Sequence, residues 1–178
     1  WLDSLVRYPK ILDVVEDSVG PDILCWGSIF WTKEARSASF VSWHQDIAYW
    51  GLTDGDVVNV WVALSPANAI SGCMSVLPGS HLQPPLPHDD RYHEDNMLTR
   101  GQEIAVDVDS SKTVQMPLQS GEMSLHDIRI AHGSGRTAPM NAGSDSRSST
   151  YLLVFGKRSL TRTTPHLYVV WTTMVTSH

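Results

Sequence analysis

The first part of the chain carries apolar residues with the period of a helix. In residues 9–20 (PKILDVVEDSVG) they recur three and four positions apart, which places them on one stripe of a helix surface. Proline is favoured in the first turn of a helix and glycine just after its last turn, and Pro9 and Gly20 occupy these places. We predict one short amphipathic helix, whose apolar stripe consists of Ile11, Leu12, Val15 and Val19.

Beyond this helix the pattern changes to alternation with a period of two. The segments are short, rich in β-branched and aromatic residues, and separated by Gly, Pro, Asp and Ser. They cover residues 23–33, 39–45, 57–64, 73–80, 121–132, 149–157 and 166–175. Consecutive strands without helices between them predict a mainly β fold, either a sandwich or a barrel.

The segment 57–64 (VVNVWVAL) has two different faces. Alternate positions carry only valine and leucine on one side, whereas Asn59 and Trp61 share the other side. We expect the first face to pack in the core and the second to line a cavity, as a ligand-holding barrel requires.

The longest irregular stretch, residues 81–99, is rich in proline and in charges of both signs. Loops of this length in a compact domain are usually lids or disordered segments. We predict a lid over the barrel mouth, with disorder as the alternative. The register of the tail, residues 158–178, with the rest of the barrel is not predicted.

Composition narrows the class of protein. The chain has 178 residues with 42% apolar content, which suits a single domain spanning residues 1–178. A net charge of −6 without a basic cluster argues against nucleic acid as a partner, and no apolar run reaches the roughly 18 residues of a membrane span. Cys25 and Cys73 lack zinc-site spacing, so we expect buried thiols in a reducing cytoplasm. Because the chain opens without Met, we also expect it to be truncated at its N-terminus. The oligomeric state is not predicted.

The pattern His-x-Asp occurs three times, which makes it a weak signal by itself. The copies are His44/Asp46, His88/Asp90 and His93/Asp95. The last two fall in the proline-rich loop, where charged clusters are normally solvated. The first follows a strand-like run, and in an extended backbone residues i and i+2 point the same way. His44 and Asp46 could therefore supply two legs of a facial triad, the ligand set of non-haem Fe(II) oxygenases.

A third ligand would have to come from a distant strand. The segment 121–132 (GEMSLHDIRIAH) offers two candidates, since His126 and His132 share the phase of one strand. The residues alone leave both open.

Three ordered motifs carry a family resemblance. They are WHQD at 43–46, SGCMSVLPGSH at 71–81, and HGSG followed by Asn, Ser and Arg over 132–147. The strand after the first motif adds Trp-x-Ala-Leu at 61–64. Together they resemble the phytanoyl-CoA dioxygenase family of Fe(II)/2-oxoglutarate oxygenases. This resemblance implies a double-stranded β-helix (jelly roll), with His44, Asp46 and His132 as iron ligands and His126 as a neighbour without a metal bond.

The resemblance also implies a 2-oxoglutarate site. Arg147 would pair with the distal carboxylate, Ser134 would hydrogen-bond it, and Trp61 would line the pocket together with Asn59 on the same strand face. Arg147 lies farther beyond His132 than is usual in the family, which an insertion around residues 136–140 would explain. Arg136 is the rival anchor, but Arg147 directly precedes a strand that can aim its side chain inward.

The expected activity is hydroxylation of a small-molecule substrate with O2, while 2-oxoglutarate is decarboxylated to succinate and CO2. The alternatives are a catalytically inactive or differently metallated binding barrel, and a cupin-type enzyme that does not use 2-oxoglutarate. Halogenation is disfavoured, because related halogenases replace the carboxylate ligand by a small residue and Asp46 is present. The substrate cannot be read from the sequence.

Overall fold

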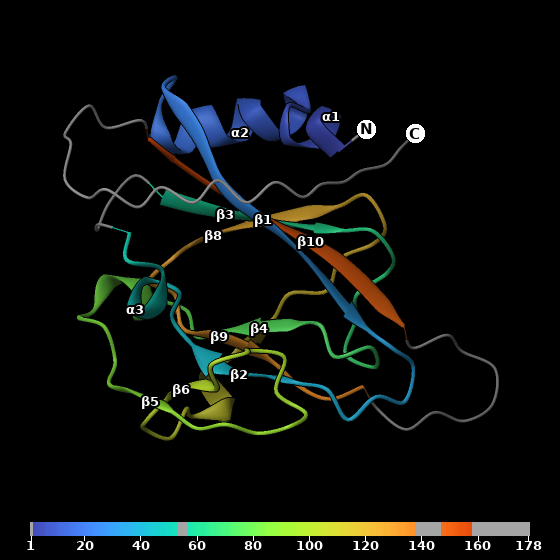
Figure 1. The fold of residues 1–178 in the computed structure, drawn as a ribbon, viewed down its shortest axis with the longest axis vertical. Coiled ribbons are helices and arrows are strands. Elements are labelled where there is room, and N and C mark those ends of the chain that lie inside the picture. Colours follow the sequence, from blue (N-terminus) through green and yellow to red (C-terminus); the bar gives the residue numbers. More distant parts are fainter. Residues whose placement is uncertain (1, 53–56, 138–146, 158–178) are drawn as a thin grey trace.

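The computed structural model describes residues 2–52, 57–137 and 147–157. Two four-stranded antiparallel sheets face each other, and helices cover the outer side of one of them (Figure 1). The helices are α1 (Leu2–Val6), α2 (Pro9–Val19) and α3 (Ile47–Trp50), with single 3-10 turns η1 (Ser80–Leu82) and η2 (Ser110–Lys112). The strands are β1 (Ile23–Lys33), β2 (Val41–His44), β3 (Val57–Ala63), β4 (Met74–Val76), β5 (His88–Asp90), β6 (Gln102–Ile104), β7 (Val114–Gln115), β8 (Met123–Asp127), β9 (His132–Ser134) and β10 (Ser148–Lys157).

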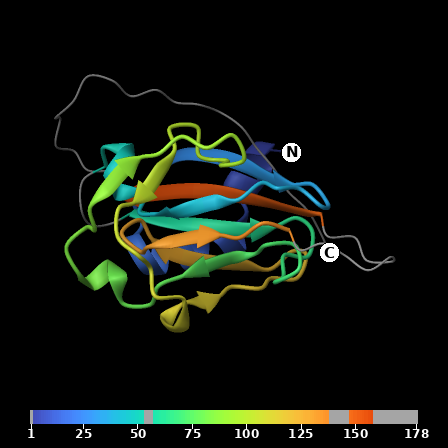
Figure 2. The ribbon, with the colours of Figure 1, turned by 90° about the horizontal axis from the view of Figure 1, so that it is seen from below.

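The chain passes back and forth between the two sheets, as it does in a jelly roll. One sheet has the order β1-β10-β3-β8 and the other β2-β9-β4-β7, while β5 and β6 form a separate pair. Figure 2 shows β2, β9 and β4 side by side, with the other sheet behind them. The predicted mainly β, jelly-roll fold is confirmed.

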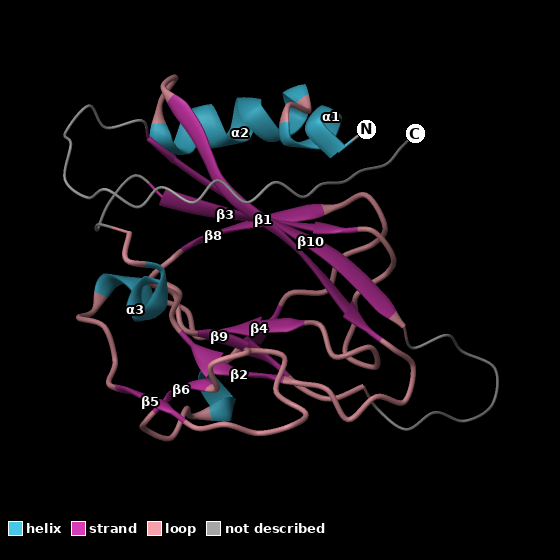
Figure 3. Ribbon diagram, in the orientation of Figure 1, coloured by secondary structure: helices cyan, strands magenta, loops and turns pink. Residues whose placement is uncertain are grey.

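The predicted first helix is present as α2. Pro9 lies in its first turn, and Gly20 ends it with φ 86°, a left-handed value that favours glycine, while its N–H donates to Glu16 O. The stripe of Ile11, Val15 and Val19 is buried against the β1-β10-β3-β8 sheet. The helices and this sheet therefore enclose the main apolar core (Figure 3).

The two faces of β3 lie in different environments. Val58, Val60 and Val62 join the core under the helices. Asn59 and Trp61 point to the opposite side, into the space between the two sheets. The main apolar core thus lies outside the jelly roll, which leaves its interior available for a polar site.

The prediction of one strand over residues 121–132 is wrong. The chain leaves the first sheet at Asp127, turns with Ile130 N–H donating to Asp127 O at 3.0 Å, and enters the second sheet as β9 at His132. A buried Ile128 anchors the turn. The period of two continues across it, which concealed the change of sheet. His126 and His132 consequently reach the interior from opposite sheets.

The loop 81–99 contains the end of η1 and all of β5, which pairs with β6. The tail 158–178, including the predicted strand 166–175, lies outside the described residues. Among the helices that are described, none is long and apolar enough to cross a membrane.

Candidate metal centre

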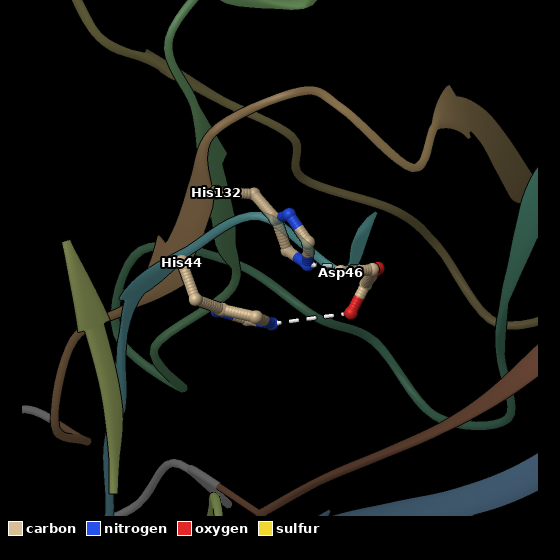
Figure 4. Close-up of side chains that lie close together, drawn as sticks. All are labelled: His44, Asp46 and His132. Carbon is tan, nitrogen blue, oxygen red and sulfur yellow. Dashed lines mark ion pairs between the residues drawn. The ribbon is translucent and has the colours of Figure 1, made fainter. Parts of the chain in front are cut away.

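Three buried side chains meet between the sheets. His44 ends β2, Asp46 follows it at the start of α3, and His132 begins β9 directly opposite His44 in the strand register. Figure 4 shows the two imidazoles and the carboxylate converging. His44 Nε2 lies 3.4 Å from Asp46 Oδ1, and His132 Nε2 lies 3.8 Å from Asp46 Oδ2. Their ligand atoms all lie within 4.8 Å of one another, which is close enough to share one ion.

The backbone orients both imidazoles. The Nδ1 of His44 lies 2.9 Å from Ser42 O, and the Nδ1 of His132 lies 3.0 Å from Ile130 O. A carbonyl can only accept, so each Nδ1 carries the proton and each Nε2 presents a free lone pair. This is the usual arrangement of metal-binding histidines, in which the second ring nitrogen donates to a fixed acceptor.

The protonation states suit metal binding. Burial lowers the pKa of His132 to about 3, so the ring is neutral at neutral pH. Burial alone would raise the pKa of Asp46, but the neighbouring His132 and His44 outweigh it and hold the pKa below its usual value. Two imidazoles and one carboxylate, open to a cavity on one side, are the donor set of a non-haem Fe(II) site. The three side chains can therefore bind one iron ion.

A cavity of about 420 Å³ opens beside the triad. Strands of both sheets, α3 and the segment 97–102 contribute to its wall. Besides the triad, the lining residues are Ile29, Phe30, Trp31, Lys33, Val41, Tyr49, Trp50, Trp61, Ala67, Gly72, Cys73, Met74, Met97, Leu98, Thr99, Gln102, Gly133, Ser134, Ser148, Thr150 and Leu152. Most of these side chains are apolar, so a charged group in the wall requires an explanation.

The charged group is Lys33, which sequence reasoning missed. It is 6% exposed, and its Nζ donates to Ser134 Oγ at 2.7 Å, to Gly135 O at 2.5 Å and to Gly72 O at 3.2 Å. No carboxylate among the described residues pairs with it. Burial lowers the pKa of Lys33 to about 8, so the lysine is an ammonium at neutral pH, without a counter-ion in the part of the chain that is described.

Strand alternation could have indicated Lys33. It ends β1 in phase with Ile29 and Trp31, and all three line the cavity. The glycine of the SGC motif leaves room for the ammonium, because a Cβ at Gly72 (φ 67°) would lie 3.2 Å from Lys33 Nζ. No local pattern in the sequence indicates that the end of β1 lies beside Ser134, because Lys33 and Ser134 are 101 residues apart.

The other residues predicted for the co-substrate site divide into two groups. Ser134 and Trp61 line the cavity. Asn59 does not line it, because its amide lies against Asp46, with Nδ2 2.7 Å from Oδ2. The structure does not bring the two arginines to the cavity. Arg147 is 56% exposed and pairs with Glu34 at 2.9 Å, and Arg136 is 49% exposed. The anchoring role of an arginine therefore stays a prediction.

The remaining His-x-Asp copies do not join the triad. His88 accepts a hydrogen bond from the Gln45 backbone N–H at 3.0 Å, and Asp95 pairs with Arg136 at 2.9 Å. Among the described residues, the triad is the only group of three or more His, Cys, Asp or Glu side chains that could hold a metal ion.

Gln45 connects the metal site to the proline-rich loop. Its side chain is fully buried, its Nε2 donates to Arg129 O at 2.5 Å, and its Oε1 accepts from Leu86 N–H at 2.8 Å. The loop 81–99 is thus hydrogen-bonded to Gln45, which lies between His44 and Asp46 in the sequence. Residues 97–99 at the end of this loop line the cavity. Its opening and closing as a lid stays a prediction.

Comparison with known proteins is consistent with this geometry. The chain is 31% identical over 137 residues to the probable alpha-ketoglutarate-dependent hypophosphite dioxygenase of Stutzerimonas stutzeri, covering 75% of this chain and 47% of that protein. The apo structure of the non-heme monooxygenase ThoJ superposes with a TM-score of 0.73 and 35% identity, covering 87% of this chain and 54% of that one. EvdO2 from Micromonospora carbonacea var. aurantiaca, complexed with 2-oxoglutarate, superposes with a TM-score of 0.69 and 26% identity, covering 92% and 66%.

The family assignment rests on a longer stretch than any single motif. The chain spans about half the length of the curated relatives it matches. The family model for phytanoyl-CoA dioxygenase (PhyH) matches residues 2–148, which include the whole triad and Lys33. The chain belongs to the phytanoyl-CoA dioxygenase family.

Proposed function

We propose that this chain is an oxygenase domain that uses Fe(II) and 2-oxoglutarate to hydroxylate a small organic substrate. The observation that carries the proposal is the pairing, in one cavity, of a facial triad with a buried ammonium for which the described residues offer no counter-ion. The triad matches a ferrous ion with open coordination positions, and the ammonium matches the free carboxylate of a dicarboxylic acid.

His44, Asp46 and His132 would hold the iron. With iron, 2-oxoglutarate and dioxygen bound, the site would supply the oxidising chemistry that yields succinate, CO2 and a hydroxylated substrate. The presence of the Asp46 carboxylate favours hydroxylation over halogenation, because that ligand occupies the position a halide would need.

Lys33 and Ser134 would orient the co-substrate. Ser134 lies two residues beyond His132 on β9, and two residues of a strand span about 6.6 Å. A five-carbon dicarboxylate has a comparable length, so one end can lie at the metal while the other accepts from the Ser134 hydroxyl and pairs in charge with the Lys33 ammonium. Trp31 and Trp61, with ring centroids 6.3 Å apart, would exclude water from this end of the cavity.

The substrate would occupy the remaining part of the cavity. That wall comes from α3 and the segment after the loop, through Tyr49, Trp50, Met97 and Leu98. Apolar and aromatic side chains there favour a substrate that presents uncharged C–H bonds to the metal.

An anaerobic titration tests the proposal. Apo-protein receives Fe(II) and then 2-oxoglutarate, and the visible charge-transfer band of the chelated complex is recorded. Wild type is expected to develop the band and Asp46→Ala is not. A folded wild-type protein without the band would favour the alternative, an inactive or differently metallated binding barrel.

The anchor is tested in the same titration. Lys33→Met removes a charge-assisted contact worth about 1.5–3 kcal/mol, so 2-oxoglutarate affinity should fall about 10- to 100-fold. Arg147→Met is the matched control at the exposed arginine and should leave the affinity nearly unchanged. The reverse result would return the anchoring role to Arg147.

A further inference from the structure

Two polar residues that the chemistry above does not use lie close to the Asp46 carboxylate. Asn59 is fully buried and His126 is 7% exposed, and neither lines the cavity. They are direct cross-strand partners in the register of β3 and β8. Asn59 Nδ2 lies 2.7 Å from Asp46 Oδ2 and 3.1 Å from His126 Nε2. One amide group therefore contacts both the metal-binding carboxylate and a second histidine.

The hydrogen-bond donors in this row can be assigned. An ionised carboxylate only accepts, so the NH2 group of Asn59 must face Asp46. Its second N–H then points at His126 Nε2, which has to be the unprotonated ring nitrogen. His126 thus acts as a hydrogen-bond acceptor that holds the Asn59 amide in this orientation and opposes a flip of its O and NH2 groups.

The contact distinguishes the two oxygens of Asp46. Oδ2 accepts from Asn59 and lies 3.8 Å from His132 Nε2, whereas Oδ1 lies 3.4 Å from His44 Nε2. With Oδ2 held, the carboxylate cannot rotate freely about its Cβ–Cγ bond. Oδ1 is then the oxygen presented to an ion at the triad.

Stability does not explain this pair. Asn59 Oδ1 and His126 Nδ1 are buried without a hydrogen-bond partner in the part of the chain that the structure describes. Each such atom costs about 1–3 kcal/mol relative to a satisfied group, and apolar residues of similar shape would avoid that cost. Polar groups that are kept at a cost beside a reactive centre point to a role at that centre.

We propose that Asn59, itself oriented by His126, is a positioning residue that fixes Asp46 as a single-oxygen metal ligand through Oδ1. The inference rests on the proposed function, since it presupposes a metal at the triad. It replaces the predicted role of Asn59 in holding 2-oxoglutarate. Outer partners that hold a metal ligand typically contribute about 10- to 100-fold to metal affinity.

The test uses Co(II) as a spectroscopic probe of the apo-protein, without 2-oxoglutarate or turnover. Affinity is measured by competition with a chromophoric chelator, coordination by the visible Co(II) spectrum, and folding by thermal unfolding of the apo-protein. Asn59→Leu and His126→Leu should each weaken Co(II) binding, by about 10- to 100-fold for Asn59→Leu, and should change the spectrum. His126→Gln keeps an acceptor near the place of Nε2 and should restore most of the affinity.

Ser124→Ala is the matched control. Ser124 lies on β8 in the neighbouring cross-strand pair with Trp61, and its Oγ is also buried without a partner, but it does not touch Asp46. It should bind Co(II) like wild type. Wild-type affinity and spectrum in Asn59→Leu would overturn the inference, as would a parallel loss of affinity and melting temperature in all four variants. A wild-type protein that binds no Co(II) would overturn the proposed function as well, which separates the two failures.

Discussion

Lys33 holds a charge where burial opposes it. Three oxygen acceptors contact its ammonium, but the described residues offer it no anion. A group in this state gains from any ligand that brings a carboxylate, because the ligand supplies the missing counter-charge. The same burial makes the affinity for that ligand depend on pH.

We expect 2-oxoglutarate binding to weaken as pH rises through the pKa of Lys33. Burial lowers this pKa to about 8, so the lysine is charged below that value and loses its proton above it. The dissociation constant should be flat near neutrality and should rise by up to about tenfold per pH unit above the pKa. It can be measured for the Fe(II)-loaded protein from about pH 6.5 to about pH 9.5.

Lys33→Met is the control for this titration. It should bind 2-oxoglutarate weakly at every pH and without the alkaline transition. An unchanged transition in Lys33→Met would assign the dependence to another group.

At the scale of elements, the position of Asp46 depends on hydrogen bonds that connect the turn after β2 to two other segments of the chain. The buried Gln45 bonds the turn after β2 both to the β8–β9 turn through Arg129 O and to the proline-rich loop through Leu86 N–H. Arg129 lies 84 residues and Leu86 lies 41 residues further along the chain than Gln45. The local sequence His-x-Asp brings His44 and Asp46 close together. The hydrogen bonds of Gln45 then hold this pair in place relative to β9, which carries His132.

Gln45→Leu should therefore destabilise the apo-protein. The change leaves Arg129 O and Leu86 N–H without their partner, at a cost of about 2–6 kcal/mol for the two groups together. Urea unfolding measures the loss. Gln83→Leu makes the same substitution at an exposed position of the same loop and should stay within about 0.5 kcal/mol of wild type. Equal stability of the two variants would contradict a fastening role for Gln45.

At the scale of the whole molecule, stability and chemistry occupy different spaces. The main apolar core lies between the helices and the outer face of the β1-β10-β3-β8 sheet, and the triad lies between the two sheets. The residues of β3 and β10 alternate between these spaces, so each strand serves both. A loss of core packing can then lower stability without moving the ligands.

Val15→Ala provides the test at this scale. Val15 is fully buried on α2, and removing two methyl groups there should cost about 2 kcal/mol in the free energy of unfolding. Metal affinity under native conditions should not change. Val14→Ala, at a position 38% exposed, should affect neither property. A marked loss of metal affinity in Val15→Ala, with the protein still folded, would show that the two spaces are coupled.

The sequence by itself determined the elements whose signals are local. The stripe of α2, the alternation of β1, β3 and β10, and the proximity of His44 to Asp46 all follow from residues a few positions apart. The motif order was enough to indicate the family, because such motifs record long-range relations that a single period does not.

The tertiary structure alone decided which distant groups meet. Period-two alternation says which face a residue takes but not which strand lies opposite, and it continues unchanged through the turn that separates β8 from β9. The family resemblance pointed to Arg147 as the anchor, which stays a prediction, whereas strand pairing is what placed Lys33 beside Ser134. The Asn59–His126 pair close to Asp46 likewise depends on the register of β3 with β8, which is a property of the assembled sheet.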